Sequence, residues 1–123
     1  EKPGNIKNLD QIENDDIILD IGPQTILSIK NVILSSNTVL WNGPAGYFEK
    51  PSFENGTKEI TKIIADKTYK DKIFSIAGGG ETVAAINKFK KLKSFTFVST
   101  AGGAFLEFLE GKKLPGISAL DRK

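Results

Sequence analysis

The sequence predicts an α/β fold in which a parallel sheet is flanked by helices. Short apolar runs at 17–21, 38–41, 73–77 and 95–98 alternate with segments whose apolar residues recur at helical spacing. Strands that are apolar throughout and alternate with helices are typical of a parallel sheet that is covered on both faces. We therefore expect a Rossmann-like sheet of about four strands, as part of a larger doubly wound domain.

The chain opens with a polar segment at 1–15, which shows no apolar period and is expected to be a lead-in loop. The domain itself is expected at 16–123. Its first strand is predicted at 17–21. A proline at the first helical position and a helical apolar stripe then predict a helix from about Pro23 to Leu34.

The run at 38–41 predicts the second strand, and the Gly- and Pro-rich stretch 42–46 predicts a loop after it. Apolar residues at helical spacing predict a further helix from Thr57 to about Thr68. The third strand is expected at 73–77.

Consecutive glycines, Gly78 to Gly80, follow the third run, and a helical pattern begins at once. Glycines let main-chain N–H groups approach a ligand, and a helix N-terminus carries unpaired donors and a partial positive charge. This junction therefore predicts a phosphate site. Glu81 on its rim would repel bare phosphate, which suggests a helix cap or a ligand for a divalent cation that bridges phosphates.

The last elements are a strand at 95–98 and a short helix through Glu110, which Gly111 is placed to end. We expect a turn at 114–117 and a last apolar anchor at Leu120. The lysines before this strand are interpreted as charge that complements a helix dipole and aids solubility; they are Lys88, Lys90, Lys91 and Lys93.

All strands of a parallel sheet end at one edge, so the loops at Gly22, 43–46, 78–80 and 101–103 should open onto one crevice. No Lys follows the glycines as a Walker A loop requires, and the dinucleotide fingerprint is missing. A site of backbone amides, one rim carboxylate and Mg²⁺ remains. Such a site suits phosphoryl transfer, where catalysis is mainly positioning and charge stabilisation.

The composition excludes several function classes. With no Cys and no His, the chain has no disulfide, Ser/His/Asp triad or zinc site of the usual kind. Seventeen basic and 15 acidic residues give a net charge of +2, so neither nucleic acid nor membrane is an expected partner. We expect a cytoplasmic protein, since no leader or long apolar run is present. The lack of Met, even at position 1, suggests a piece of a longer protein.

Several motifs together resemble the C-terminal part of phosphoglycerate kinase. The resemblance runs from about Asp16 to Leu120, with the motifs in the order and spacing of that family. The motifs are Leu19-Asp20-Ile21-Gly22-Pro23, Trp41-Asn42-Gly43-Pro44-Ala45-Gly46-Tyr47-Phe48-Glu49, Ala77-Gly78-Gly79-Gly80-Glu81-Thr82, Val98-Ser99-Thr100-Ala101-Gly102-Gly103-Ala104, and the stretch from Leu106 to Gly116.

The resemblance implies a phosphotransferase with a carboxyl group as acceptor, which moves a phosphoryl group between 1,3-bisphosphoglycerate and ADP in glycolysis. Its cofactor would be Mg²⁺ with ADP or ATP. The family has two Rossmann-like domains, of which the N-terminal one holds 3-phosphoglycerate or 1,3-bisphosphoglycerate. With that domain missing here, we expect the isolated fragment to be inactive. The parent is expected to be a monomer, and the fragment is expected to pair with another copy or with its missing half.

The resemblance also implies roles for individual residues. Glu49 would bind the ribose hydroxyls, and Glu81 would be the carboxylate associated with the metal. Leu19 and Tyr47 would form apolar walls of the adenine slot. The other residues expected to bind nucleotide are Asn42, Gly43, Pro44, Gly46, Gly78, Gly79, Gly80 and Thr82.

The catalytic candidates are Gly102 and Gly103, whose amides would face the phosphoryl group in transit. The chain departs from the usual pattern of the family at three positions, with Glu81 for Asp, Ala101 for Gly and Tyr47 for an aliphatic residue. The rival hypothesis is a non-catalytic phosphate- or nucleotide-binding interaction module on the same fold. No Arg precedes Arg122, so no motif loop contains a guanidinium that could clamp a phosphate.

Overall fold

The computed structural model describes residues 3–120. The outer ends of the two predicted regions, 1–2 and 121–123, lie outside the described residues. The strands are β1 (Thr38–Asn42), β2 (Phe74–Gly78) and β3 (Phe97–Ser99), and the helices are α1 (Pro23–Leu34), α2 (Asn55–Asp71), α3 (Gly80–Lys88), α4 (Gly102–Leu109) and α5 (Pro115–Leu120). Short 3-10 turns lie at Leu9–Gln11, Pro51–Phe53 and Leu92–Ser94.

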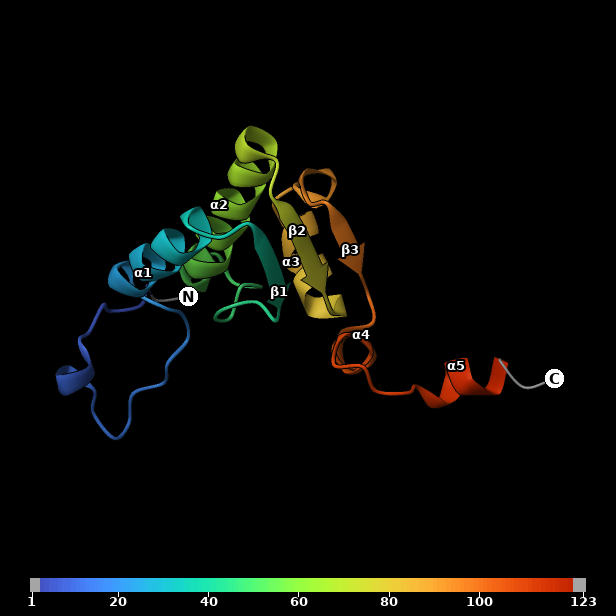
Figure 1. Cartoon of the computed structure of the whole chain (residues 1–123). Coiled ribbons are helices and arrows are strands. Elements are labelled where there is room, and N and C mark those ends of the chain that lie inside the picture. The colour runs from blue at the N-terminus through green and yellow to red at the C-terminus, as the bar shows by residue number, and fades with distance from the viewer. Residues whose placement is uncertain (1–2, 121–123) are drawn as a thin grey trace.

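The strands form a three-stranded parallel sheet in the order β1-β2-β3, so the predicted fold class is confirmed with one strand fewer than expected. Leu40 lies opposite Ile76, which lies opposite Phe97. Because the strand order does not reverse, right-handed crossovers carry α2 and α3 to the same face of the sheet. Figure 1 shows these helices behind the strands, with α1 packed against α2.

The core lies between this face of the sheet and the helices. Ile64 of α2 and Ile86 of α3 are almost completely buried, and they pack with Ala77 of β2. Ile33 completes the core from α1, as the helical apolar stripe predicts. Lys67 of α2 is also buried, and its Nζ donates to the carbonyl of Leu34 at the C-terminus of α1, where a positive charge is favourable.

The opposite face of the sheet is mostly uncovered among the described residues. Of the described helices, only α4 reaches it, where Phe105 stacks on Phe97 with ring centres 6.3 Å apart. The expectation of helices that cover both faces therefore holds only at this edge. Leu40, Phe74 and Phe97 point to this face and are 43%, 49% and 52% exposed. The reason is the strand order, since both crossovers of an unreversed sheet lie on one side.

The strand predicted at 17–21 is wrong. Ile17 and Ile18 are 78% and 76% exposed, and they pair with no strand of the described sheet. The carbonyl of Leu19 accepts a hydrogen bond from the N–H of Tyr47, in the loop after β1, at 2.7 Å. The apolar run is therefore a loop that packs against another loop.

The end of the chain also differs from the expectation. Gly111 has a left-handed φ of +82° just after α4, as predicted for a residue that ends a helix. The turn predicted at 114–117 is instead the start of α5, because Pro115 occupies a first helical position where its missing N–H costs nothing. Leu120 is 85% exposed, so it is not the apolar anchor that we expected.

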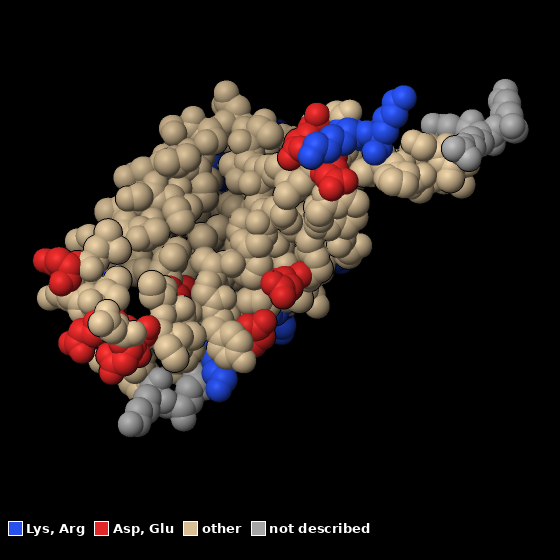
Figure 2. Space-filling view, turned by 90° about the horizontal axis from the view of Figure 1, so that it is seen from below, with Lys and Arg blue, Asp and Glu red and all other residues tan. Residues whose placement is uncertain are grey.

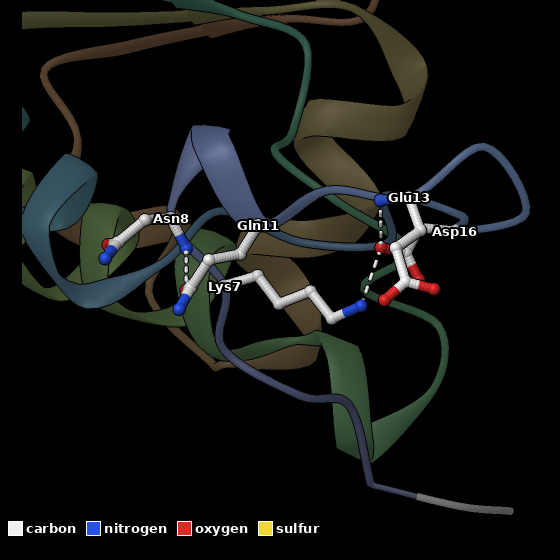
Figure 3. Close-up of polar contacts among 5 residues, drawn as sticks. All are labelled: Lys7, Asn8, Gln11, Glu13 and Asp16. Atoms are coloured by element: carbon white, nitrogen blue, oxygen red, sulfur yellow. Dashed lines mark hydrogen bonds and ion pairs between the residues drawn. The ribbon is translucent and has the colours of Figure 1, made fainter.

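Residues 3–16 contain one short 3-10 turn, which hydrogen bonds between Asn8 and Gln11 close, and a second turn from Glu13 to Asp16 (Figure 3). The Asp16 carboxylate accepts hydrogen bonds from the N–H of Glu13 at 2.9 Å and from Lys7 Nζ at 2.8 Å. The Glu13 N–H and the Lys7 ammonium together hold the pKa of Asp16 below its usual range. Within the described chain, no helix is both long and apolar enough to cross a membrane.

Candidate functional site

The carboxyl ends of the three strands meet at one edge, where Asn42, Gly78 and Ser99 lie side by side in register. The glycine-bearing loops follow these residues directly. Figure 2 shows the molecule from this side, where the centre of the surface consists of uncharged residues and acidic side chains lie nearer the margins. The edge therefore offers main-chain and amide groups rather than a cluster of charges.

The N-termini of α3 and α4 come together at this edge. A Cβ added to Gly102 would lie 3.3 Å from the Cα of Gly79, so the two backbones approach too closely for larger residues. Gly79 has a φ of +96°, and its N–H donates to the carbonyl of Ser99 at 2.9 Å. The first N–H groups of each helix have no partner within the helix, so their positive ends converge.

Asn42 lies among these glycines. Its Oδ1 would be 2.8 Å from a Cβ on Gly79, 3.6 Å from one on Gly78 and 3.8 Å from one on Gly102. Gly80 and Gly103 differ from these residues, because a Cβ on either would meet nothing within 4 Å. Their backbones are therefore the parts of the two helix ends that stand open to a ligand.

Thr82 is buried, with only 1% of its surface exposed, although the sequence suggests a phosphate contact there. Its Oγ1 accepts a hydrogen bond from the N–H of Gly43 at 2.7 Å. The carbonyl of Gly43 in turn accepts from Trp41 Nε1 at 2.8 Å. The hydroxyl of Thr82 thus fixes the loop after β1 to the first turn of α3.

Asp20 is a residue of this site that the sequence analysis missed. Its Oδ2 accepts from the N–H of Gly56 at 2.9 Å, at the start of α2. A Cβ on Gly46 would lie 2.6 Å from both Asp20 Oδ1 and the carbonyl of Leu19. The sequence feature that could have indicated this role is an acidic residue within an apolar run. A carboxylate that is partly buried needs hydrogen-bond donors.

The expected base-binding residues are neighbours in the structure. The N–H of Tyr47 bonds to the carbonyl of Leu19, and the Tyr47 ring is 46% exposed with Lys50 Nζ 5.9 Å from its centre. Pro44 lies partly buried in the same loop. Glu49 is exposed directly after the buried Phe48, so its carboxylate is accessible to a ligand.

The comparisons with known proteins agree on one family. The family model for phosphoglycerate kinase matches residues 1–112. This chain belongs to the phosphoglycerate kinase family. It is 48% identical over 116 residues to the phosphoglycerate kinase of Wolbachia sp. subsp. Brugia malayi (strain TRS), a match that covers 94% of this chain and 29% of that protein.

Solved phosphoglycerate kinase structures share the fold. The structure from Coxiella burnetii superposes with a TM-score of 0.83 at 43% identity, over 94% of this chain and 29% of the other. The structure from Pyrococcus horikoshii OT3 has a TM-score of 0.71 at 38% identity, over 85% of this chain and 24% of the other. The chain thus spans less than a third of the length of these phosphoglycerate kinases.

Ala101 is one of the three positions at which this chain departs from the usual pattern of the family. The residue precedes α4 with a φ of −86°, a conformation that alanine adopts without strain. The replacement of glycine at this position therefore leaves the approach of Gly102 to Gly79 intact.

Proposed function

We propose that this chain is the nucleotide-binding portion of a phosphoglycerate kinase, which transfers a phosphoryl group between 1,3-bisphosphoglycerate and ADP. The observation that carries the proposal is the convergence of the α3 and α4 N-termini at Gly79 and Gly102, on the edge where all the strands end. Two helix N-termini that meet, each with N–H groups that have no partner within its own helix, favour a phosphate chain between them. The family membership selects the nucleotide.

The roles of the residues follow from their positions. The open backbones of Gly80 and Gly103 would donate to phosphate oxygens, with the Gly102 N–H beside them at the start of α4, and Asn42 would add its amide. Glu49 is accessible at the end of the same loop and would accept hydrogen bonds from the ribose hydroxyls. Gly78 and Gly79 would act differently, since their lack of a side chain lets Phe105 and Asn42 pack against them and so lets the loops meet.

Glu81 fits a magnesium ion that is bound mainly through the nucleotide. It is exposed in the first turn of α3, beside the proposed phosphate site. Among residues 3–120, no group of three or more His, Cys, Asp or Glu side chains could hold a metal by itself. Magnesium in such sites usually takes one or two carboxylates, with phosphates and waters as its other ligands. The ion would neutralise the negative charge of the phosphates, since residues 3–120 contain no arginine that could do so.

We also propose that the isolated chain binds nucleotide weakly and does not catalyse the transfer. It spans 29% of the Wolbachia relative, so most of that enzyme has no counterpart here. The fixed loops around Asn42 and Gly79 provide binding groups for one substrate only. We therefore expect the isolated chain to bind nucleotide without catalysing the transfer.

Titration of the 123-residue chain with Mg-ADP tests this function. We expect weak binding that depends on magnesium, and we expect Glu49→Ala to weaken it about tenfold because hydrogen bonds to a charged group are lost. Glu107→Ala, an exposed acid on α4, is the matched control and should bind as the unchanged chain does. A folded chain that shows no binding, or equal affinities for Glu49→Ala and the control, would contradict the proposal.

A further inference from the structure

Lys88, at the end of α3, makes contacts that its position among other lysines does not suggest. Its Nζ donates a hydrogen bond to the carbonyl of Phe48 at 2.7 Å and lies 2.6 Å from Glu54 Oε2. The Lys88 and Glu54 side chains are only 35% and 20% exposed. This lysine therefore joins α3 to the segment after β1, 40 residues earlier in the chain.

The carbonyl that Lys88 binds belongs to the residue directly before Glu49. The Phe48 side chain is 6% exposed, so the backbone there is fixed by burial on one side and by the ammonium group on the other. The following turns are closed by bonds from the N–H of Lys50 to Tyr47 and from the N–H of Phe53 to Lys50. Glu49 thus projects from a short, well-anchored turn.

The same helix holds this loop at a second point. Thr82, in the first turn of α3, accepts from the N–H of Gly43, whereas Lys88 binds Phe48 from the last turn. Lys88 lies six positions after Thr82 along the α-helix, which corresponds to a rise of about 9 Å. The helix therefore sets the spacing between the glycine junction at its N-terminus and the turn that carries Glu49.

We propose that Lys88 is a positioning residue for nucleotide binding, which holds Glu49 at the distance from the glycine junction that suits the ribose of a nucleoside diphosphate. This inference rests on the proposed function. Lys88 itself touches no ligand in this account. It acts through the Phe48 carbonyl and through Glu54, so its removal should release Glu49 without changing the phosphate-binding amides.

The test compares Lys88→Met with Lys88→Arg, and uses Lys93→Met as the control because Lys93 is an exposed lysine that follows α3. Each 123-residue variant is titrated with Mg-ADP and with the magnesium complex of 2′,3′-dideoxy-ADP, which lacks the ribose hydroxyls. The ratio of the two affinities reports the ribose contact alone. Hydrogen exchange of the Lys50 and Phe53 amides reports the anchoring of the turn without any nucleotide.

We expect the unchanged chain, Lys88→Arg and Lys93→Met to prefer ADP over the dideoxy analogue. In Lys88→Met this preference should fall at least about fivefold, and the two amides should exchange faster, while affinity for the dideoxy analogue stays constant. If Lys88→Met prefers ADP as strongly as the unchanged chain does, and its Lys50 and Phe53 amides exchange at the same rates, the inference is overturned. If the unchanged chain binds neither nucleotide, the proposed function fails instead, and unchanged exchange in Lys88→Met would then overturn the anchoring as well.

Discussion

Replacing Gly79 by alanine should unfold the junction between β2 and α3 and abolish nucleotide binding. Gly79 has φ +96° and ψ 143°, a region of backbone conformation that is nearly restricted to glycine. Its Cβ would also lie 2.8 Å from Asn42 Oδ1. Backbone strain of about 1–3 kcal/mol and overpacking of similar size predict a loss of about 2–6 kcal/mol in the free energy of unfolding.

Gly80→Ala is the matched control for this change. A Cβ there would meet nothing within 4 Å, and the residue is the first of α3. Alanine at an unstrained helical position should leave the free energy of unfolding unchanged or raise it by about 0.4–1 kcal/mol. Denaturant unfolding of both variants measures the difference. Equal stability of Gly79→Ala and Gly80→Ala would show that the close approach of the loops does not require glycine.

The isolated chain should self-associate through the uncovered face of its sheet. Leu40, Phe74 and Phe97 stand about half exposed there, and no strand residue on this face carries a formal charge. An uncharged apolar patch can pair with a second copy of itself about a two-fold axis. We choose a second copy as the occupant because, among the described residues, α1, α2 and α3 pack on the opposite face, and α4 covers only the edge of this one, where Phe105 stacks on Phe97.

Phe97→Lys should shift the chain to the monomer. Half-burial of one phenylalanine stabilises by about 1 kcal/mol, and a two-fold dimer loses this contribution twice, so the dissociation constant should rise about 30-fold. Tyr69→Lys is the control, since Tyr69 is an 86% exposed aromatic residue of α2. Sedimentation velocity over a range of concentrations measures the shift. A wild-type chain that stays monomeric at about 0.1 mM would contradict the prediction.

Local sequence signals predicted the elements whose causes are local. The bounds of α1 were predicted at Pro23 and Leu34 because proline at the first position and a helical stripe lie within the helix itself. The strand predicted at 17–21 failed because a strand also needs a neighbour, and Leu19 instead bonds to Tyr47. The one-sided sheet could not be predicted, because the side of each crossover depends on the strand order.

In the candidate site, too, the features with local causes could be predicted from the sequence, and the contacts between distant residues could not. Glycine loops after strands and their common edge were predictable from the pattern of parallel strands. The contacts that fix these loops were not, because Asp20 reaches Gly56 across 36 residues and Lys88 reaches Phe48 across 40. Lys88 looked like one of several charges at a helix end. Only the fold shows which of those lysines has a carbonyl within reach.

A chimera tests the central proposal most directly, namely that this chain supplies the nucleotide-binding portion of a phosphoglycerate kinase. The chain would replace the segment of the Wolbachia enzyme to which it is 48% identical, and the rate would be followed in both directions of the reaction. We predict a kcat/KM for Mg-ADP within about tenfold of that of the parent enzyme, and a large loss when Glu49→Ala is added. A folded chimera that binds 3-phosphoglycerate but transfers no phosphoryl group would contradict the claim.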